Sequence, residues 1–189
     1  MKFKNDNDRQ YEGEWYDDKR HGLGKESFAN RDKYSGKYEH GAFHGLGMYT
    51  WASGDTYIGH YEAGVKKGHG IWKSGSGDRE TYEGFFNVNR FNGLGVYTFE
   101  NGKTYEGYWE DGKKRGIAIE TDVSGGEYIG DFDHKSEQTT KCCQYTYPNK
   151  TKYIGGVLNQ IKQGFGKIEF PSGSEYIGFF QHGKKSGLG

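Results

Sequence analysis

Aromatic, glycine and polar residues alternate along this chain in a pattern that returns at a nearly fixed interval. Each return opens with the pattern Tyr-x-Gly-x-aromatic, as in Tyr82-Glu83-Gly84-Phe85-Phe86. The eight copies start 23 or 25 residues apart, at Tyr11, Tyr34, Tyr57, Tyr82, Tyr105, Tyr128, Tyr153 and Tyr176. A fixed period of this length is typical of stacked repeat proteins. The sequence therefore predicts an array of repeats, numbered one to eight, over residues 11–189, after a polar N-terminal tail at residues 1–10.

Each repeat is expected to form a β-hairpin. Its first, third and fifth residues share one face of a strand, because side chains alternate with period two. The fifth residue is aromatic in every copy except Val157, as strands prefer. A loop and a Gly-x-Gly pair such as Gly93 and Gly95 should then precede a second strand, whose aromatic residues lie two and four positions beyond the pair. Turn residues such as Asn101-Gly102 close the repeat and favour hairpins.

The composition supports a sheet with an aromatic stripe rather than a conventional globular core. Mean hydropathy is −1.03, but the formal net charge is zero and the chain has 16 Tyr, 12 Phe and 4 Trp. Each such ring can bury ~150 to 250 Å². We therefore expect an all-β fold, an elongated single-layer antiparallel sheet of about seven and a half hairpin repeats of 23 residues. Glycines on the ring-bearing face leave room for rings to lie across the backbone, so Gly84 and Gly107 should not tolerate valine.

Two repeats depart from the pattern. Repeat six loses its expected glycines after Phe132, which leaves open whether it forms a regular hairpin. Repeat eight stops at Gly189, so we expect its second strand to be absent. An open strand edge is a template for another strand. We therefore expect Ile177, Phe179 and Phe180 to form an edge that takes a partner strand, pairs with a second copy in a homodimer, or is covered by the final residues of the chain.

The repeated pattern resembles the MORN (membrane occupation and recognition nexus) repeat over essentially all of residues 11–189. The residues that carry the resemblance include Glu106-Gly107-Tyr108-Trp109 and Asp111-Gly112-Lys113-Lys114-Arg115-Gly116. The resemblance implies that successive hairpins form one elongated, twisted sheet with a groove lined by aromatics. It also implies a scaffold, similar in kind to the stand-alone cytoskeletal and ciliary proteins of that family.

No motif in the sequence indicates an enzyme, a cofactor, a metal ion or nucleic acid. The Gly-x-Gly pairs lack the third glycine and the helix of a nucleotide-binding loop. The seven histidines are scattered, whereas zinc sites need three or four convergent ligands. No segment resembles a signal peptide or a membrane span. We therefore expect a cytoplasmic protein, and the resemblance favours the cytoskeleton or the cilium and its axoneme.

Two binding hypotheses remain, and each uses different residues. In the first, the aromatic face binds a helix or an extended segment of a protein partner, because Trp and Tyr dominate binding hot spots. The candidate anchors are Trp15, Tyr38, Trp51, Tyr61, Trp72, Phe86, Phe99 and Trp109. The alternative is that these rings pack only against one another.

In the second hypothesis, the loops between the two strands of each repeat gather on one edge of the sheet and bind anionic phospholipid such as phosphoinositides. The cations of this predicted edge are Arg20, Lys66, Lys67, Lys113, Lys114 and Arg115. The alternative is that these charges are only solvated. Stable anchoring to a membrane generally takes two signals, and the sequence has no lipidation motif.

Overall fold

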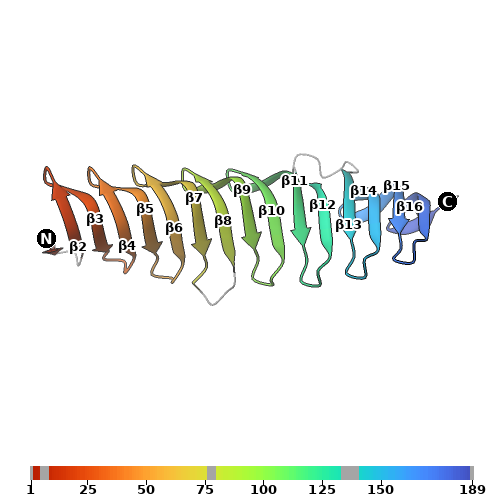
Figure 1. Cartoon of the computed structure of the whole chain (residues 1–189), viewed down its shortest axis with the longest axis horizontal. Helices are drawn as coiled ribbons and strands as arrows, with labels where there is room; N and C mark the ends of the chain where they lie inside the picture. The colour runs from red at the N-terminus through yellow and green to blue at the C-terminus, as the bar shows by residue number, and fades with distance from the viewer. Residues whose placement is uncertain (1, 5–8, 76–79, 133–140, 188–189) are drawn as a thin grey trace. The chain divides into compact units, whose positions relative to one another are not determined.

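The computed structural model describes residues 2–4, 9–75, 80–132 and 141–187, which form antiparallel β-strands joined by turns and loops. The expected all-β fold of tandem hairpins is confirmed. The chain divides into two compact units, an N-terminal half of residues 1–100 and a C-terminal half of residues 101–189. Within each half, consecutive strands lie side by side in chain order and form a single layer (Figure 1).

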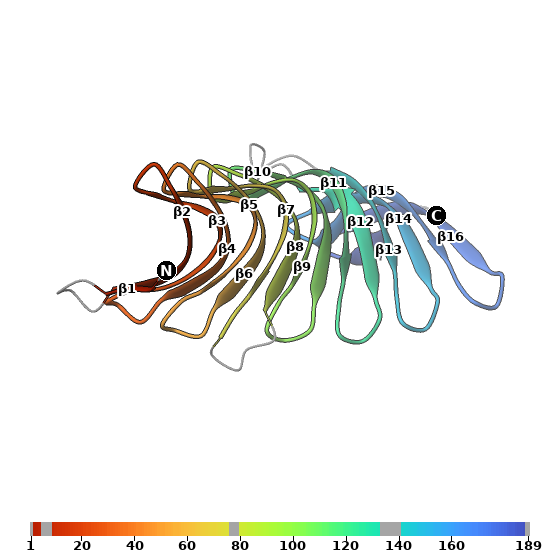
Figure 2. The same cartoon turned by 60° about the vertical axis from the view of Figure 1, so that its left-hand side comes forward.

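The N-terminal half contains repeats one to four. Its strands are β1 (Lys2–Lys4), β2 (Gln10–Tyr16), β3 (Lys19–Ser27), β4 (Lys33–Glu39), β5 (Ala42–Thr50), β6 (Thr56–Glu62), β7 (Val65–Lys73), β8 (Thr81–Asn87) and β9 (Arg90–Thr98). Strand β1 pairs with β2, with Phe3 opposite Tyr11. This pairing corrects the expectation of a tail over residues 1–10, because part of that stretch belongs to the sheet. The strands of this half curve strongly along their length (Figure 2).

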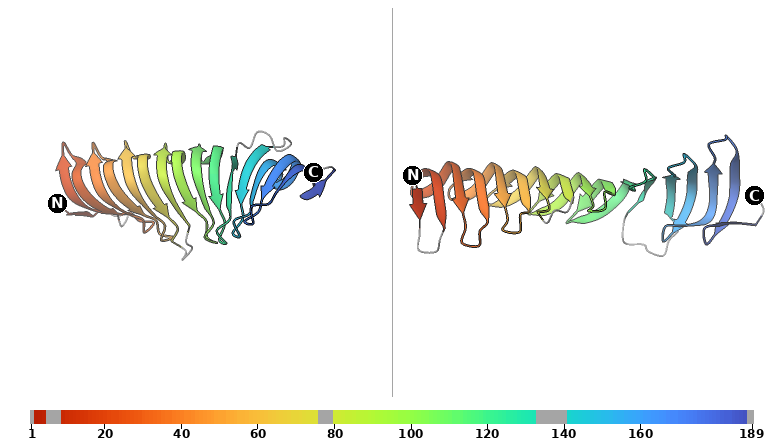
Figure 3. Two further views of the ribbon diagram at one scale, coloured as in Figure 1. Left: turned by 45° about the vertical axis from the view of Figure 1, so that its right-hand side comes forward. Right: turned by 90° about the horizontal axis from the view of Figure 1, so that it is seen from below.

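The C-terminal half contains repeats five to eight, and its strands also follow one another in chain order (Figure 3). They are β10 (Thr104–Glu110), β11 (Lys113–Thr121), β12 (Glu127–Asp131), β13 (Lys141–Thr146), β14 (Lys152–Leu158), β15 (Ile161–Glu169), β16 (Glu175–Gln181) and β17 (Lys184–Ser186). Repeat six does supply two paired strands, β12 and β13, although residues 133–140 between them lie outside the described part.

The end of repeat eight is also more complete than the sequence suggested. Strand β17 pairs with β16, placing Ser186 opposite Phe179 and Lys185 opposite Phe180. The second strand of repeat eight is therefore present as a short segment. Of the alternatives expected for this edge, the structure shows cover by the final residues of the chain, which fold back onto Phe179 and Phe180.

Every repeat except the sixth turns within two residues, so its second strand begins earlier than the sequence suggested. In repeat three, Ala63 and Gly64 have φ angles of 48° and 86°, and β7 starts at the next residue. Two consecutive residues with positive φ give the tight turn that matches the twist of a hairpin. The Gly-x-Gly pair therefore lies inside the second strand. Its first glycine, Gly68, has φ 79° and lies where the register with β6 shifts.

The repeat tyrosine lies across two glycines. A Cβ atom on Gly59 would lie 2.4 Å from the Tyr57 hydroxyl, and one on Gly70 would lie 2.6 Å from the same ring. The ring is fully buried, and its hydroxyl donates a hydrogen bond of 3.1 Å to the carbonyl of His60. The expectation that glycines make room for rings is confirmed. The ring comes from the same strand for the first glycine and from the neighbouring strand for the second.

Repeat six keeps this arrangement with one change. Its tyrosine, Tyr128, lies across Gly130, but Cys143 replaces the glycine on the facing strand. The Cys143 side chain is buried, and Tyr128 packs against the apolar cluster that contains it. Burial raises the pKa of this thiol to about 11. A small buried thiol thus stands where repeats one to four and repeat seven have their second glycine.

Consecutive repeats are joined through main-chain atoms. In repeats two, three, four and eight, the turn donates a backbone N–H group to the carbonyl of the second residue in the preceding repeat's second strand. In the N-terminal half these bonds run from Gly41 to Arg20, from Gly64 to Phe43 and from Asn89 to Lys66. Successive turns of this half therefore stack on one another.

Candidate functional site

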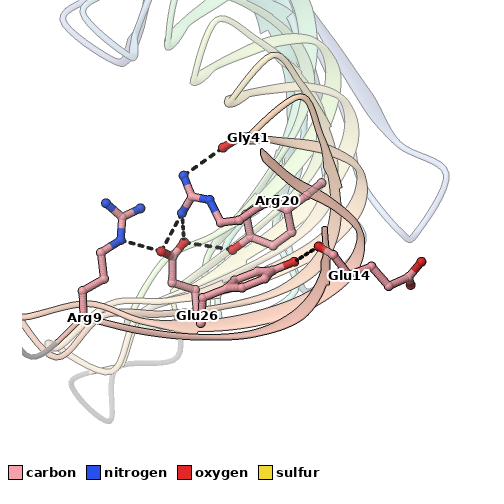
Figure 4. Close-up of polar contacts among 7 residues, drawn as sticks. Arg9, Glu14, Arg20, Glu26 and Gly41 are labelled. Carbon is pink, nitrogen blue, oxygen red and sulfur yellow. Dashed lines mark hydrogen bonds and ion pairs between the residues drawn. The ribbon is translucent and has the colours of Figure 1, made fainter. Parts of the chain in front are cut away.

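The candidate site is the face of the sheet that carries the repeat tyrosines, which we call the inner face. In the N-terminal half, this face is on the inside of the curved strands. Figure 4 shows Arg20 and Glu26 on that side and the Glu14 carboxylate on the opposite, outer face. Glu26 lies directly opposite Tyr11 on one neighbouring strand and opposite Tyr34 on the other. Rings and charged groups therefore share the inner face.

Half of the predicted aromatic anchors belong to a buried layer. Tyr38, Tyr61, Phe86 and Trp109 are each less than 10% exposed. These rings meet the repeat tyrosines edge to face, as Tyr38 meets Tyr11 and Tyr34 at centroid distances of 5.2 and 5.1 Å. Such pairs stabilise the fold beyond their buried area. These four rings are part of the core and are not accessible to a binding partner.

The other predicted anchors keep exposed surface. Trp15 is 37% exposed, and Trp51, Trp72 and Phe99 are half-buried. Trp51 packs against Tyr49 at a centroid distance of 4.8 Å. An accessible aromatic surface therefore remains above the buried layer, mainly at the ends of the second strands.

One position on the inner face alternates between cations and aromatic rings. It is the second residue of the second strand in every repeat except the sixth, and we call it the variable position. It is occupied by Arg20, Phe43, Lys66, Phe91, Lys114, Lys162 and Lys185. Phe43 and Phe91 stack on their repeat tyrosines, each at 3.8 Å between centroids. The cations lie over rings in the same place, such as Lys114 at 4.5 Å from the Tyr105 centroid.

In repeat one, the cation at the variable position is neutralised within the chain. Glu26 is 3% exposed, and Arg20 Nη1 contacts its two carboxylate oxygens at 2.5 and 2.6 Å. The Tyr38 hydroxyl donates to the same carboxylate at 3.0 Å, and Arg9 contacts it from the other side (Figure 4). Burial raises the pKa of Tyr38, and the neighbouring carboxylate adds to the effect. Arg20 also donates to the carbonyl of Gly41 at 2.9 Å.

In repeat five, the cation at the variable position is neutralised in the same way. Lys114 Nζ lies 2.6 Å from Glu120, and Lys103 Nζ lies 2.7 Å from the same carboxylate. Burial alone would raise the pKa of Glu120, but hydrogen bonds from the two lysines outweigh it and hold that pKa below its ordinary value. The acidic residue lies six positions after the cation, as in repeat one.

Repeat three has the cation without the acid. Trp72 occupies the place of the acidic residue, and Lys66 Nζ lies 4.4 Å from the Trp51 centroid and 5.0 Å from the Tyr57 centroid. Within the described ranges, no carboxylate pairs with Lys66. Burial lowers the pKa of this lysine. The Tyr61 hydroxyl is buried with no hydrogen-bond partner there, and burial raises its pKa.

The six cations of the predicted lipid-binding edge are divided between the two faces. Arg20, Lys66 and Lys114 lie on the inner face, over aromatic rings. Lys67 and Arg115 pair with outer-face glutamates, at 2.5 and 2.9 Å. Lys113 is exposed. The expectation of one basic edge is therefore corrected, because the tight turn places these residues in strands whose side chains alternate between faces.

The residues of the predicted C-terminal edge are also divided. Ile177 and Phe179 are exposed, whereas Phe180 is buried against Tyr153 and Tyr176. Comparable apolar residues, such as Ile58, are exposed on the outer face of other repeats. Exposure at Ile177 and Phe179 is therefore a property of the outer face and is not special to this end of the array.

Sequence reasoning missed the acidic partners, Glu26 and Glu120. A signal is present within the chain, because the variable position and the residue six places later change together in four repeats, although Lys66 and Lys162 are followed by Trp72 and Ile168. A cation is followed by Glu in repeats one and five, whereas Phe is followed by Tyr in repeats two and four. Alignment of the repeats with one another would have paired these two columns.

In the part of the chain that the structure describes, no three His, Cys, Asp or Glu side chains come together as metal ligands. The same residues include no helix long and apolar enough to cross a membrane.

The family model of the MORN repeat matches most of the chain. The matched segments are residues 11–33, 34–56, 57–79, 82–104, 105–127, 153–175 and 176–189. The stretch left between residues 127 and 153 is repeat six, in which Cys143 replaces a glycine. No curated protein sequence is significantly similar to the chain.

Solved structures share the fold at low sequence identity. The G-box domain of the microcephaly protein CPAP aligns with a TM-score of 0.61 and 12% identity, covering 95% of this chain and 92% of that one. The TCP domain of Drosophila melanogaster SAS-4, in complex with a proline-rich motif of Ana2, gives a TM-score of 0.54 and 11% identity over 94% and 87%. The TCP10 domain of Danio rerio CPAP, with a peptide of STIL, gives 0.53 and 12% over 92% and 75%.

Proposed function

Because the chain belongs to the MORN repeat family, we propose that it is a non-catalytic scaffold whose inner face binds an extended segment of a protein partner. The observation that carries this proposal is the row of half-buried rings, including Trp51, Trp72 and Phe99, that lies above the buried layer. In each half, the strands contact the strands next to them in chain order, so no second layer covers this face in the described residues. A sheet face with exposed rings typically meets another layer or a ligand.

An extended segment suits this face better than a helix. The solved domains of similar fold from Drosophila melanogaster and Danio rerio are bound to a proline-rich motif and to a peptide. Proline-rich segments have no internal hydrogen bonds and dock on aromatic surfaces. Rings at regular intervals on the inner face offer such a segment a series of contacts.

We propose the cytoplasm as the compartment, and a cytoskeletal or ciliary assembly as the setting. The resemblance to cytoskeletal and ciliary proteins of the family favours this setting, and so does the similar fold of the CPAP G-box, for which a role in centriole elongation is suggested. Tagging the chain with a fluorescent protein in its own cells tests the proposal. Diffuse signal that never joins a cytoskeletal or ciliary structure contradicts it.

Binding to phosphoinositide membranes is the weaker alternative. The cations that suggested it are divided between the two faces, and Lys67 and Arg115 are paired with glutamates. Surface charges that are paired in this way offer little net attraction to an anionic surface. This alternative would be supported if the chain sedimented with phosphoinositide vesicles at physiological salt.

The decisive experiment compares one ring on each face of the N-terminal half. Peptides of twelve residues are selected from a displayed library on the full chain, and their affinity is measured for Trp51→Ala and for Phe85→Ala. Trp51 is half-buried on the inner face, and Phe85 is 49% exposed on the outer face. Truncating a hot-spot ring costs about 2 kcal/mol or more. We expect a loss of at least about tenfold in affinity for Trp51→Ala and little change for Phe85→Ala.

Both variants should melt close to the parent chain, which a thermal scan checks. If Phe85→Ala alone weakens binding, the partner surface is the outer face. If the library gives no binder, the proposal that this chain binds extended segments is wrong.

A further inference from the structure

We propose that the segment bound on the inner face carries an acidic side chain, and that Lys66 and Tyr61 of repeat three hold its carboxylate. This inference rests on the proposed function and adds the chemistry of the partner. It depends on two polar side chains of one hairpin that lack an acceptor in the described part of the chain, whereas Arg20 of repeat one and Tyr38 of repeat two share the Glu26 carboxylate.

The position of Lys66 is fixed by its backbone. Its N–H group donates to the side-chain oxygen of Asn89 at 2.9 Å, and its carbonyl accepts the Asn89 N–H at 3.2 Å. The side chain then extends over the rings of Trp51 and Tyr57. Rings attract a cation through their faces but accept few of its hydrogen bonds. An ammonium group has three donors, and no described carboxylate takes any of them.

Tyr61 supplies a second unsatisfied donor on the same hairpin. It is the direct cross-strand partner of Lys66 and is 5% exposed. Its hydroxyl has no hydrogen-bond partner among the described residues. The corresponding tyrosine one repeat earlier, Tyr38, donates to the Glu26 carboxylate at 3.0 Å. A buried hydroxyl without a partner costs free energy.

The chain itself shows which acceptor fits this position. Where a cation and an acid occupy the inner face together, in Arg20 with Glu26 and in Lys114 with Glu120, the acceptor is a carboxylate. In repeat three, Trp72 occupies the acidic place, so the carboxylate has to come from outside the chain. A water molecule would satisfy the hydroxyl but would leave the charge of a partly buried ammonium without a counter-ion. Charge complementarity therefore favours an Asp or Glu of the partner.

The test uses the selected twelve-residue peptides and the full chain. We expect them to share an Asp or Glu at one fixed position. Replacing that residue by Asn or Gln should weaken binding about tenfold, as expected for the loss of a charge-assisted hydrogen bond. On Lys66→Phe, the same replacement should change affinity less than about twofold. Tyr61→Phe should weaken binding of the acidic peptide by about threefold.

The variants are chosen so that the chain still folds. Lys66→Phe copies Phe43 and Phe91, which stack on the repeat tyrosines in the same place. Trp72→Glu copies the acid of repeat one, so an internal carboxylate should compete with the peptide and remove the preference for an acidic residue. Lys67→Gln removes one positive charge from the outer face and should keep the affinity within about twofold.

Each outcome decides a different point. Selected peptides without a fixed acidic residue, or an equal loss from Glu→Gln on the parent chain and on Lys66→Phe, overturn the carboxylate site and leave the scaffold function standing. Equal effects of Lys66→Phe and Lys67→Gln also overturn it, because net charge would then explain the binding. Absence of any selected peptide overturns both proposals.

Discussion

In repeat one, Tyr11 lies across Gly13 and Gly24, and its counterpart in repeat three lies across Gly59 and Gly70 in the same way. The two hairpins also share the same register shift after the first of these glycines. On the inner face, however, repeat one satisfies its cation internally, and repeat three leaves a lysine among aromatic rings. The contrast teaches that the repeat tyrosine and its two glycines determine the hairpin. The variable position and the residue six places later determine which charges the inner face carries.

The largest expected effect concerns the packing of tyrosine over glycine, which repeats one and three share. Gly24→Val and Gly70→Val should each destabilise the chain by about 3 kcal/mol or more, because the new side chain meets a buried ring. A Cβ atom would lie 2.5 Å from the Tyr11 ring at Gly24. Urea unfolding measures both, with Lys25→Val on the exposed outer face as the control. A variant that is as stable as the parent would refute the packing argument, and a large difference between the two would break the comparison.

The next largest effect concerns the Arg20–Glu26 ion pair, which repeat one has and repeat three lacks. Arg20→Phe should cost about 2 to 3 kcal/mol, because it leaves the buried Glu26 carboxylate with weaker partners. The double variant Arg20→Phe with Glu26→Tyr copies Phe43 and Tyr49 of repeat two and should recover most of the loss. Urea unfolding of the single and double variants gives the coupling between the two positions. Additive losses would show that these positions act independently.

Alkaline pH should distinguish the repeat tyrosine of repeat three, Tyr57, from that of repeat one, Tyr11. Burial raises the pKa of Tyr57 to about 12, so the folded chain holds this proton more strongly than the unfolded chain, whose tyrosines titrate near 10. Its contribution to stability is complete below pH 10 and is lost as pH rises toward 12. Burial also raises the pKa of Tyr11, but Arg20 opposes the shift. Thermal scans from pH 9 to 12 should fall less steeply for Tyr57→Phe than for Tyr11→Phe, and equal slopes would contradict this assignment.

The smallest effect is expected at the variable position of repeat three. Lys66→Phe should change the free energy of unfolding by less than about 1 kcal/mol, toward greater stability, because it replaces a partly buried cation by a ring. Chemical denaturation of this variant beside Arg20→Phe sharpens the comparison. A loss as large as that of Arg20→Phe would mean that Lys66 contributes to folding as its counterpart does.

The part of the fold that follows from local sequence was predicted correctly. Tyrosine, glycine and the fifth-position aromatic recur with period two, and strand geometry then places them on one face. The start of the second strand was missed because Ala63 is a poor signal for positive φ, although its backbone adopts 48°. A loop was therefore expected where a tight turn occurs. Lys66 was assigned to an edge for that reason, although it lies in a strand on the inner face.

The candidate site was less predictable than the fold. Five aromatics at the fifth position were predicted to be anchors, but burial depends on rings from neighbouring repeats, which a single repeat does not reveal. Tyr38 is closed in this way by Tyr11 and Tyr34, whereas Trp51 keeps an accessible surface. The neutralisation of Arg20 depends on an acid six residues away, and that pairing appears only when the repeats are compared with one another.

The hydrogen bonds that join one turn to the next have a consequence for how such a chain changes over generations. The bond from Gly64 to Phe43 and the bond from Asn89 to Lys66 use only main-chain atoms. These main-chain bonds form whatever side chains lie on either side, although Asn89 and Arg20 add side-chain bonds at two of the junctions. Duplication, loss or exchange of a whole repeat of about 23 residues therefore keeps the main-chain part of each junction, and repeats with different charges can be combined in new orders.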